Sequence, residues 1–482
     1  MNIAMISPEA VPFAKTGGLA DVAGTLPRAL AKAGANVSLI MPFYRKISAK
    51  KFGIKPLKKT IKVMVGSKEV TGDIHTVKVA QNVDAYFIDQ PKYFDREELY
   101  QTIDGDYPDN SERFIFFSKA AIALLETLKQ NYDIVHCHDW QSALIPVYLK
   151  TLYRDHKKLA KIKTVLTIHN LGYQGVFWHL DMPLVGLGWE YFTFDKLEFY
   201  GKINFLKSGI VYADAITTVS KKYAQEILTS EFGCGLEGAL KQRAKDLYGI
   251  LNGIDYTEWN PATDSLLPKM YSPDDLSGKA VCKAKLQSHF KLPVRADVPL
   301  FGIISRLTVQ KGFDLLEEAL PTLMKSDIQL AILGTGEAKY HQLLKTLVQQ
   351  FPKGMGLALA FDNTLAHLIE AGSDFFLMPS HYEPCGLNQM ISMKYGTVPI
   401  VRATGGLDDS IVSFDPKSGK GTGLKFTEYK AADFLTVADK ALGVFKQPKT
   451  FKKLVSNAMA EDFSWDRSAK EYIELYKKVI GD

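Results

Sequence analysis

The stretch NIAMISPEAVPFAKTGGLADVAGTLPRALAKAGANVSLIM, residues 2–41, indicates how the first part of the chain folds. Residues 2–6 and 37–41 are short apolar runs of the kind found in buried strands. Between them apolar residues recur at helical spacing, at Leu19, Val22, Ala23, Leu26 and Leu30. Gly34 stops this helix before the second strand. A strand, a helix and a strand in this order predict parallel strands in a doubly wound sheet.

The same alternation continues along both halves of the chain. In the first half, further strands are expected at Ile134–His136, Thr164–Ile168 and Ala215–Val219. In the second half, apolar runs predict five strands: PLFGIIS (299–305), QLAILG (329–334), GLALAF (356–361), DFFLMP (374–379) and VPIV (398–401). Helices are expected between them, including Phe313–Leu323 and Leu387–Tyr395. Each half therefore predicts its own parallel α/β sheet.

A chain of 482 residues is too long for one core, and two or three domains are expected. The turn-rich segment LNGIDYTEWNPATD (251–264) separates the halves, so we expect domains over residues 1–253 and 254–463. Residues 464–482 predict a final helix that packs back on the first domain. One face of this helix carries Trp465, Ala469, Tyr472 and Tyr476. The domains are expected to face a cleft at the carboxyl ends of their strands, where open α/β sheets bind ligands.

Composition excludes several classes of protein. The formal net charge of +6 and the pI of about 8.7 are only mildly basic, and no arginine-rich arm indicates a nucleic-acid partner. The lysine-rich stretch 50–62 is typical of a solvated strand face or of an anion-binding patch. The four cysteines have no metal-binding or redox spacing, and Cys137 and Cys282 are expected to be reduced core thiols. No apolar run is long enough for a membrane span and MNIAMISPEA begins a strand, so we expect a cytoplasmic protein.

Two loops that follow predicted strands carry cations. KTGGLADV (15–22) places Lys15 and paired glycines before a helix N-terminus, although a plain loop-to-helix turn has the same composition. SRLTVQKG (305–312) brings Arg306 and Lys311 into one short loop, where both can bind a diphosphate unless they are simply surface cations. Because both cations lie in a loop, we expect them to be exposed and to contribute little to stability.

A third loop, HYEPCGLNQMISMKYG (381–396), follows the strand DFFLMP. It places Glu383 at a loop tip, where a carboxylate can bind sugar hydroxyls, and a helix begins near Leu387. Backbone N–H groups at that helix N-terminus suit a phosphate oxygen. The glycine pair in Thr404–Gly406 follows the next strand. Several anion-binding loops at one sheet edge fit a nucleotide diphosphate.

Polar residues also follow strands of the first half. HCHDW (136–140) superficially looks like a metal site, but alternation along a strand sends neighbouring side chains to opposite faces. Asp139, His169 and Asn252 fit better as groups at strand ends that hold sugar hydroxyls. A structural role remains open for His136 and for His169.

These motifs resemble those of the glycogen and starch synthase family of retaining glycosyltransferases, over essentially the whole chain. KTGGL (15–19), SRLTVQKG (305–312), EPCGLNQ (383–389) and TGGL (404–407) are highly specific in this order. The resemblance implies a GT-B fold, with two Rossmann-like doubly wound α/β domains facing a central cleft. It implies an acceptor-side first domain, a nucleotide-sugar-binding second domain, and no metal or bound cofactor.

The resemblance also implies the reaction and its residues. Glucose is transferred from ADP-glucose to the non-reducing end of an α-1,4-glucan with retention of configuration. The residues implied to be catalytic are Lys15, His169, Arg306, Lys311 and Glu383. Those implied to bind substrate are Lys15, Gly18, Asp21, Asp139, Asn252, Phe361, Cys385, Gly386, Leu387 and Thr404. Phe361 stands where related chains usually carry a Tyr that stacks on adenine.

Catalysis of this kind depends on charge stabilisation. Lys15, Arg306 and Lys311 would neutralise the departing diphosphate. Glu383 and the backbone carbonyl of His169 would stabilise a glucosyl cation. Two alternatives stay open, namely a catalytically silent glucan-binding protein and a related glycosyltransferase or phosphorylase with another donor. UDP-glucose as donor, the natural acceptor and the oligomeric state are also left open.

Overall fold

The computed structural model describes residues 1–102 and 104–481. The chain divides into two compact units. Unit 1 contains Met1–Gly253 together with the segment from Trp465 onward, and unit 2 contains Ile254–Ser464. The final helix predicted over 464–482 includes residue 482, which lies outside the described residues. In the described part of the chain, no helix combines the length and the apolar character needed to span a bilayer.

Unit 1 is built on a nine-stranded sheet with the order β14-β13-β9-β8-β1-β2-β5-β4-β3. Its parallel strands are β1 (Asn2–Ile6), β2 (Asn36–Pro42), β5 (Val83–Asp89), β8 (Ile134–His138), β9 (Lys163–Ile168), β13 (Ala215–Thr218) and β14 (Leu247–Gly249). The predicted βαβ unit and the three further strands are confirmed, with strand ends that differ by one or two residues. Central strand β1 is almost entirely buried, as expected for a parallel sheet covered by helices.

One edge of this sheet is antiparallel, which the sequence did not predict. β3 (Lys55–Val65) pairs with β4 (Lys68–Ala80), and β4 pairs with β5, both antiparallel. The lysine-rich stretch 50–62 covers most of α2 (Ala49–Phe52) and the first part of β3, and its lysines are exposed. Charged lysines suit an exposed edge strand, so the stretch is a solvated strand face.

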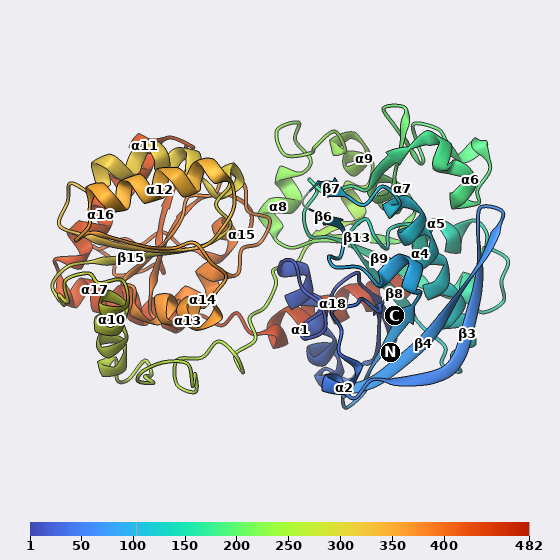
Figure 1. Ribbon diagram of the computed structural model, residues 1–482, viewed down its shortest axis with the longest axis horizontal. Helices are drawn as coiled ribbons and strands as arrows, with labels where there is room; N and C mark the ends of the chain where they lie inside the picture. Colours follow the sequence, from blue (N-terminus) through green and yellow to red (C-terminus); the bar gives the residue numbers. More distant parts are fainter. Residues whose placement is uncertain (103, 482) are drawn as a thin grey trace. The chain divides into compact units, whose positions relative to one another are not determined.

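Two helices from opposite ends of the sequence pack together in unit 1. α1 (Gly18–Lys32) buries its predicted apolar face, and α18 (Trp465–Ile480) lies beside it (Figure 1). The predicted face of α18 is also confirmed, with exposed fractions of at most 6% at Trp465, Ala469, Tyr472 and Tyr476. Ser468 Oγ donates a 2.6 Å hydrogen bond to the carbonyl oxygen of Leu251. This bond ties the start of α18 to the segment where the chain leaves unit 1.

Further helices, 3-10 turns and two small sheets complete the described part of unit 1. Its other helices are α3 (Pro91–Phe94), α4 (Asn110–Thr127), α5 (Leu144–Lys150), α6 (Met182–Val185), α7 (Phe205–Tyr212), α8 (Lys221–Glu226) and α9 (Glu237–Gln242). Its 3-10 turns are η1 (Leu159–Lys161), η2 (His179–Asp181), η3 (Trp189–Tyr191) and η4 (Ala244–Asp246). Small antiparallel sheets join β10 (Val176–Trp178), β12 (Lys202–Asn204) and β11 (Glu198–Phe199), and β6 (Gln101–Thr102) with β7 (Gly105–Asp106).

Unit 2 is built on a six-stranded parallel sheet with the order β17-β16-β15-β18-β19-β20. Its strands are β15 (Leu300–Ile304), β16 (Gln329–Leu333), β17 (Met355–Ala358), β18 (Phe375–Met378), β19 (Val398–Arg402) and β20 (Leu424–Phe426). The five predicted strands are confirmed, and β20 adds a sixth at one edge. The buried apolar runs of these strands form the core of the unit.

Helices cover both faces of the unit 2 sheet. They are α10 (Ser277–His289), α11 (Phe313–Leu323), α12 (Ala338–Gln350), α13 (Asn363–Gly372), α14 (Asn388–Lys394), α15 (Gly405–Ser410), α16 (Ala431–Phe445) and α17 (Pro448–Met459), with the 3-10 turn η5 (Val309–Lys311). Figure 1 shows α11, α12 and α16 on one face and α10, α13 and α14 on the other. The predicted helix 313–323 coincides with α11, and that predicted at 387–395 is α14, shorter by one residue at each end.

Tyr476 joins α18 to the sheet, because its ring is fully buried and its hydroxyl lies 2.8 Å from His136 Nδ1. Tyr476→Ala removes a large buried ring and should lower the free energy of unfolding by about 3–5 kcal/mol. Urea denaturation followed by circular dichroism measures this. The exposed neighbour Lys477 gives the matched control, and Lys477→Ala should cost less than about 0.5 kcal/mol. Equal stability of the two variants would contradict the packing of α18.

Candidate active site

The candidate site of unit 1 lies at the carboxyl ends of its parallel strands. Asp139 directly follows β8, His169 directly follows β9, and Asn252 comes shortly after β14. Asp139 Oδ1 accepts a 2.7 Å hydrogen bond from the backbone N–H of His169, so these two predicted residues are brought together. Asn252 is buried, and its Oδ1 has no hydrogen-bond partner among the described residues.

Asp139 has a positive backbone φ and a raised side-chain pKa. Its φ of 54° lies in the left-handed region, where strained residues are often found at functional sites. Its own N–H donates a 2.9 Å hydrogen bond to the carbonyl oxygen of Thr167, which helps to hold this conformation. Burial, reinforced by the nearby Glu9 carboxylate, raises the pKa of Asp139 to about 8. A protonated Asp139 can donate a hydrogen bond to a ligand at neutral pH.

Glu9 shapes the loop that follows β1, and the sequence prediction missed it. Its carboxylate accepts hydrogen bonds from the Thr16 N–H at 2.5 Å and from Thr16 Oγ1 at 2.7 Å. The Tyr100 hydroxyl donates a third hydrogen bond at 2.9 Å. Burial raises the pKa of Glu9, and the hydrogen bonds from Thr16 and Tyr100 oppose that rise. An acidic residue directly after the first strand was the only sequence signal for this role.

Lys15, Gly18 and Asp21 lie together where this loop enters α1. Lys15 Nζ is 2.7 Å from Asp21 Oδ1, and the two side chains are 46% and 31% exposed. Burial raises the pKa of Asp21, and the positive charge of Lys15 opposes that rise. A partly exposed pair of this kind is weak, so Lys15 can exchange Asp21 for a ligand anion at little cost.

His136 belongs to the core of unit 1. Its Nε2 lies 2.5 Å from Thr167 Oγ1 and its Nδ1 lies 2.8 Å from the Tyr476 hydroxyl, so both ring nitrogens have partners. Burial lowers the pKa of His136 to about 3, and the ring is neutral. The interpretation of His136 as a structural histidine is confirmed. Within residues 1–102 and 104–481, no group of three or more His, Cys, Asp and Glu side chains is arranged to hold a metal ion.

In unit 2 the loops after β15 and β18 meet through an ion pair. Lys311 Nζ lies 2.5 Å from Glu383 Oε2, and Ser380 Oγ donates to the same oxygen at 3.1 Å. The side chain of Lys311 is 19% exposed and that of Glu383 is 7% exposed.

The expectation that Lys311 is an exposed loop cation is wrong. The next residue, Gly312, has a φ of 82°, which turns the chain tightly after η5. A Cβ atom on Gly312 would lie 2.1 Å from the carbonyl oxygen of Pro379, so the loop packs against the end of β18. This close approach carries Lys311 inward to Glu383. Arg306 is exposed as expected, and its Nη2 donates a 3.1 Å hydrogen bond to Gln310.

The loops after β18 and β19 are also in direct backbone contact. The Gly406 N–H donates a 3.1 Å hydrogen bond to the carbonyl oxygen of Glu383. A Cβ atom on Gly405 would lie only 2.0 Å from that carbonyl oxygen, so a side chain at position 405 would push the loops apart. The neighbouring Thr404 is buried. The structure therefore brings Glu383 and Thr404–Gly406 together at one edge of the sheet.

Gln389 fixes the conformation of the loop that carries Cys385 and Gly386, and it was not predicted. Its Nε2 donates hydrogen bonds to the carbonyl oxygens of Cys385 at 3.0 Å and of Gly386 at 3.1 Å. Gly386 has a φ of 70°, which a residue with a side chain adopts rarely. Leu387 follows as the N-cap residue of α14. The Gln of the EPCGLNQ motif was the available sequence signal.

Phe361 follows β17, the edge strand of the unit 2 sheet, and 90% of its side chain is exposed. An aromatic ring that is left almost entirely in water gains little from folding. It is therefore free to stack on a flat ligand.

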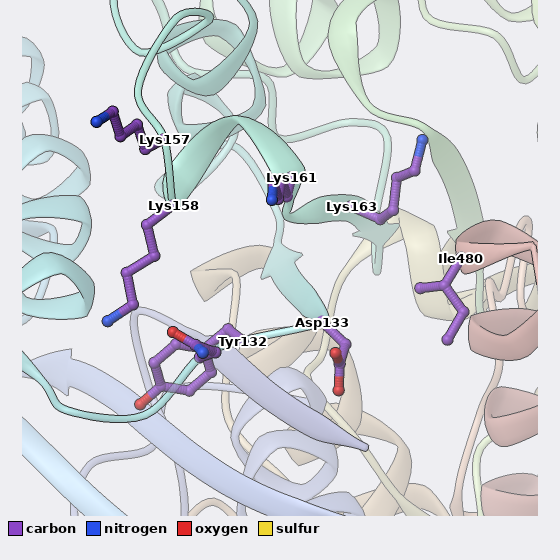
Figure 2. Close-up of a pocket in the computed structure, with 8 residues that line it drawn as sticks. Tyr132, Asp133, Lys157, Lys158, Lys161, Lys163 and Ile480 are labelled. Atoms are coloured by element: carbon purple, nitrogen blue, oxygen red, sulfur yellow. The ribbon is translucent and has the colours of Figure 1, made fainter.

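A cavity of about 410 Å³ lies at the amino ends of β8 and β9 in unit 1, on the side opposite to the candidate site (Figure 2). Its lining includes Lys157, Lys158, Lys161 and Lys163. In Figure 2 the side chains of Lys157, Lys158 and Lys163 point in different directions. Lys158 Nζ donates a 3.0 Å hydrogen bond to the carbonyl oxygen of Leu128, just after α4. This cavity is separate from Asp139 and His169, which follow the same strands.

Two Rossmann-like units, each with polar and charged side chains at the carboxyl ends of its parallel strands, define a glycosyltransferase of the GT-B class. Residues 2–242 match the family described as starch synthase catalytic domain, and residues 285–460 match glycosyl transferases group 1. The chain belongs to the glycogen and starch synthase family, and it is a hexosyltransferase.

Relatives of the chain match it from end to end. It is 50% identical to a glycogen synthase of Koribacter versatilis, covering 99% of this chain and 98% of that protein. It is 48% identical to a glycogen synthase of Pseudothermotoga lettingae, covering 100% and 99%. The catalytic domain of starch synthase IV from Arabidopsis thaliana, solved with ADP and acarbose, is 33% identical with a TM-score of 0.91, covering 100% of this chain and 99% of that one. A sucrose-phosphate synthase from Thermosynechococcus elongatus, 18% identical with a TM-score of 0.61 and covering 100% and 99%, shares the fold.

The acidity of Asp139 predicts a change of stability with pH. Its pKa is about 8 in the folded chain and close to its ordinary 3.8 in the unfolded chain. Its contribution to stability is therefore fully present below about pH 4 and is lost as the pH rises through about 8. Asp139→Asn keeps an acceptor oxygen without the charge. The variant should gain stability over the wild type by about 1.4 kcal/mol per pH unit in this window.

Urea denaturation of the wild type and of Asp139→Asn at pH 5 and pH 8 measures the effect. Asp155→Asn is the control, because the Asp155 side chain is 89% exposed. Its stability difference from the wild type should not change with pH. A stability difference for Asp139→Asn that is also independent of pH would show that Asp139 is ionised in the folded chain.

Proposed function

We propose that this chain is a glycogen synthase that transfers glucose from ADP-glucose to the non-reducing end of an α-1,4-glucan, with retention of the anomeric configuration. The observation that carries the proposal is the ion pair of Lys311 with Glu383, which lies in loops at the carboxyl ends of the unit 2 strands; Arg306 belongs to the same loop as Lys311. End-to-end similarity to glycogen synthases supports it. So does the starch synthase that binds ADP and acarbose, because its similarity also spans the whole chain.

The cations of unit 2 are proposed to stabilise the departing nucleotide diphosphate. When the bond between the anomeric carbon and the phosphate oxygen breaks, that oxygen keeps the electron pair. Lys311 and Arg306 then hold a charge that is larger in the transition state than in the bound substrate. Lys311 is prepared for this role, because its ammonium group is held by Glu383 and does not need to be ordered when the donor binds.

Glu383 is proposed to bind the glucosyl hydroxyls through Oε1, while Oε2 stays with Lys311. Backbone N–H groups of Gly386 and Leu387 are proposed to bind the distal phosphate. Cys385 and Thr404 are proposed to line this part of the site. Glu383, Cys385, Gly386 and Leu387 lie in the loop that follows β18, and Thr404 lies in the loop that follows β19.

Unit 1 is proposed to contribute the acceptor side, and residues 254–463 the nucleotide-sugar side. Lys15 and Gly18 are proposed to approach the donor diphosphate, with Asp21 releasing Lys15. Asp139 and Asn252 are proposed to hold sugar hydroxyls, and the Asn252 Oδ1 without a partner suits this role. The His169 carbonyl is proposed to face the anomeric carbon.

The proposed transfer needs neither a metal ion nor a bound cofactor. The acceptor 4-hydroxyl attacks the anomeric carbon on the face that the phosphate leaves. The new bond joins that hydroxyl oxygen to the anomeric carbon, and the hydroxyl proton passes to the departing phosphate oxygen. The cationic side chains stabilise the negative charge of the leaving diphosphate, as a divalent ion does in other enzymes. A cytoplasmic location completes the proposal.

The donor preference is the first test. Phe361 is proposed to stack on adenine, and an exposed ring of this kind favours the larger purine over uracil. We expect kcat/KM for ADP-glucose to exceed that for UDP-glucose by at least about tenfold, the equivalent of about 1.4 kcal/mol. Incorporation of labelled glucose into glycogen, with each donor in turn, measures this. Equal values would overturn the ADP preference, and no incorporation or nucleotide release with either donor would favour a silent glucan-binding protein.

The cations of unit 2 are the second test. If each stabilises the leaving diphosphate, Arg306→Ala and Lys311→Ala should lower kcat by about 10²–10³, with a smaller rise in KM for the donor. Arg306→Ala should leave the unfolding free energy unchanged, because Arg306 is exposed. Lys311→Ala leaves a buried carboxylate without its partner and should cost about 1–3 kcal/mol.

Steady-state kinetics with ADP-glucose and glycogen, together with urea denaturation, separate the two effects. Lys325→Ala is the matched control, since Lys325 is an exposed lysine of the same unit. Lys325→Ala should change neither kcat nor the free energy of unfolding. Folded Arg306→Ala and Lys311→Ala with kcat within a few-fold of the wild type would rule out this role.

A further inference from the structure

Three histidine rings form a row that runs from the core of unit 1 to its surface. The ring centroids of His136 and His138 are 4.2 Å apart, and those of His138 and His169 are 5.2 Å apart. His136 and His138 are fully buried, whereas His169 is 9% exposed. His169 is therefore the ring of this row that can meet a ligand.

One ring nitrogen of His138 lacks a hydrogen-bond partner among the described residues. His138 Nδ1 lies 2.9 Å from His169 Nε2, and this is a direct contact between two imidazoles. His138 Nε2 is buried and has no hydrogen-bond partner among the described residues. Burial lowers the pKa of His169 to about 3 and lowers that of His138 well below its ordinary value, so both rings are neutral. Each ring then carries one proton, and only one of the two facing nitrogens can donate.

Two arrangements of these protons are possible, and they differ in what is left at His138 Nε2. If His169 Nε2 donates, the His138 proton sits on Nε2 and becomes a buried N–H without an acceptor. If His138 Nδ1 donates, its Nε2 is a bare lone pair without a donor. Among backbone groups, a buried N–H without an acceptor is rarer than a buried acceptor without a full set of donors. Applied to the imidazole, the same preference favours the second arrangement.

We propose that His138 is a positioning residue that holds His169 in the tautomer with its proton on Nδ1. His169 Nε2 is occupied as an acceptor, so its Nδ1 presents an N–H group. The imidazole of His169 then donates a hydrogen bond to a ligand oxygen and cannot act as a general base. For a ligand that is a sugar, this assignment rests on the proposed function. It also agrees with a transfer in which the departing phosphate takes the proton.

The backbone of His138 is held by Ser142. The backbone N–H of His138 donates to Ser142 Oγ at 2.8 Å, and Ser142 Oγ donates to the backbone carbonyl oxygen of His138 at 2.8 Å. On the other side, the His136 ring is fixed by Thr167 and by Tyr476 of α18. The fully buried His138 ring lies between the rings of His136 and His169, and its backbone is fixed by Ser142.

Nitrogen NMR of protein labelled with ¹⁵N at its histidines tests the tautomer directly. His169→Asn identifies the His169 signals by their loss. In the wild type, His169 Nδ1 should give a protonated, pyrrole-like signal and Nε2 a bare, pyridine-like signal. The reverse pattern would overturn the proposal. The measurement uses the free chain, so it decides the tautomer even if the proposed glucosyl transfer failed in the wild type.

Two variants of His138 test the consequence for catalysis. His138→Asn places an amide nitrogen the same two bonds from Cβ as Nδ1, so it can still donate to His169. His138→Leu has no donor. In His138→Leu, we expect the ¹⁵N signals of His169 to show a mixture of the two tautomers. We also expect kcat to fall about tenfold, as for the loss of one neutral hydrogen bond, with little change in KM. His138→Asn should keep the wild-type ¹⁵N signals of His169 and most of the wild-type kcat.

His367→Leu is the matched control for the effect of burial. His367 is 1% exposed, its Nδ1 lies 2.7 Å from Asp264 Oδ2, and its Nε2 also has no partner among the described residues. It belongs to unit 2, so His367→Leu should lower stability and leave the His169 signals and kcat unchanged. A folded His138→Leu with wild-type kcat and wild-type His169 signals would refute the positioning role.

Discussion

Parallel pairing of β8 with β9 is the constraint on which the unit 1 site depends. The register sets His136 beside Val165 and His138 beside Thr167. Since both strands run in the same direction, the residues that follow them emerge at the same edge. Asp139 and His169 therefore meet although 30 residues separate them in the chain. The same geometry in unit 2 brings the loops after β15, β18 and β19 together.

Burial then decides the charge of the groups at these edges. The Glu9 carboxylate is near enough to Asp139 to raise its pKa further, and burial is the main cause of the raised pKa of both residues. Glu383 is equally buried but has Lys311 at 2.5 Å as a counter-charge. The buried Asp139 carboxyl of unit 1 and the buried Glu383 carboxyl of unit 2 are thus held differently, the first with a raised pKa and the second as an ion pair.

The last helix gives the unit 1 site its rigid base. α18 belongs to unit 1 although the whole of unit 2 precedes it in the chain. Its Tyr476 reaches the buried His136, whose ring lies next to that of His138, and the His138 ring in turn lies next to that of His169. A helix at the end of the chain therefore supports a row of side chains more than 300 residues earlier in the sequence.

The sequence by itself determined β1, β2, β8, β9 and β13 of unit 1 and five of the six strands of the unit 2 sheet, because apolar periodicity and glycine positions are local properties. It also indicated that KTGGL, SRLTVQKG and EPCGL each follow a strand, since each comes after an apolar run. Only the tertiary structure decided that Lys311 is buried against Glu383, 72 residues away, and that His138 contacts His169, 31 residues away. The antiparallel edge and the role of Glu9 were decided there too. Burial and proton sharing depend on contacts between distant segments, and local pattern carries no information about them.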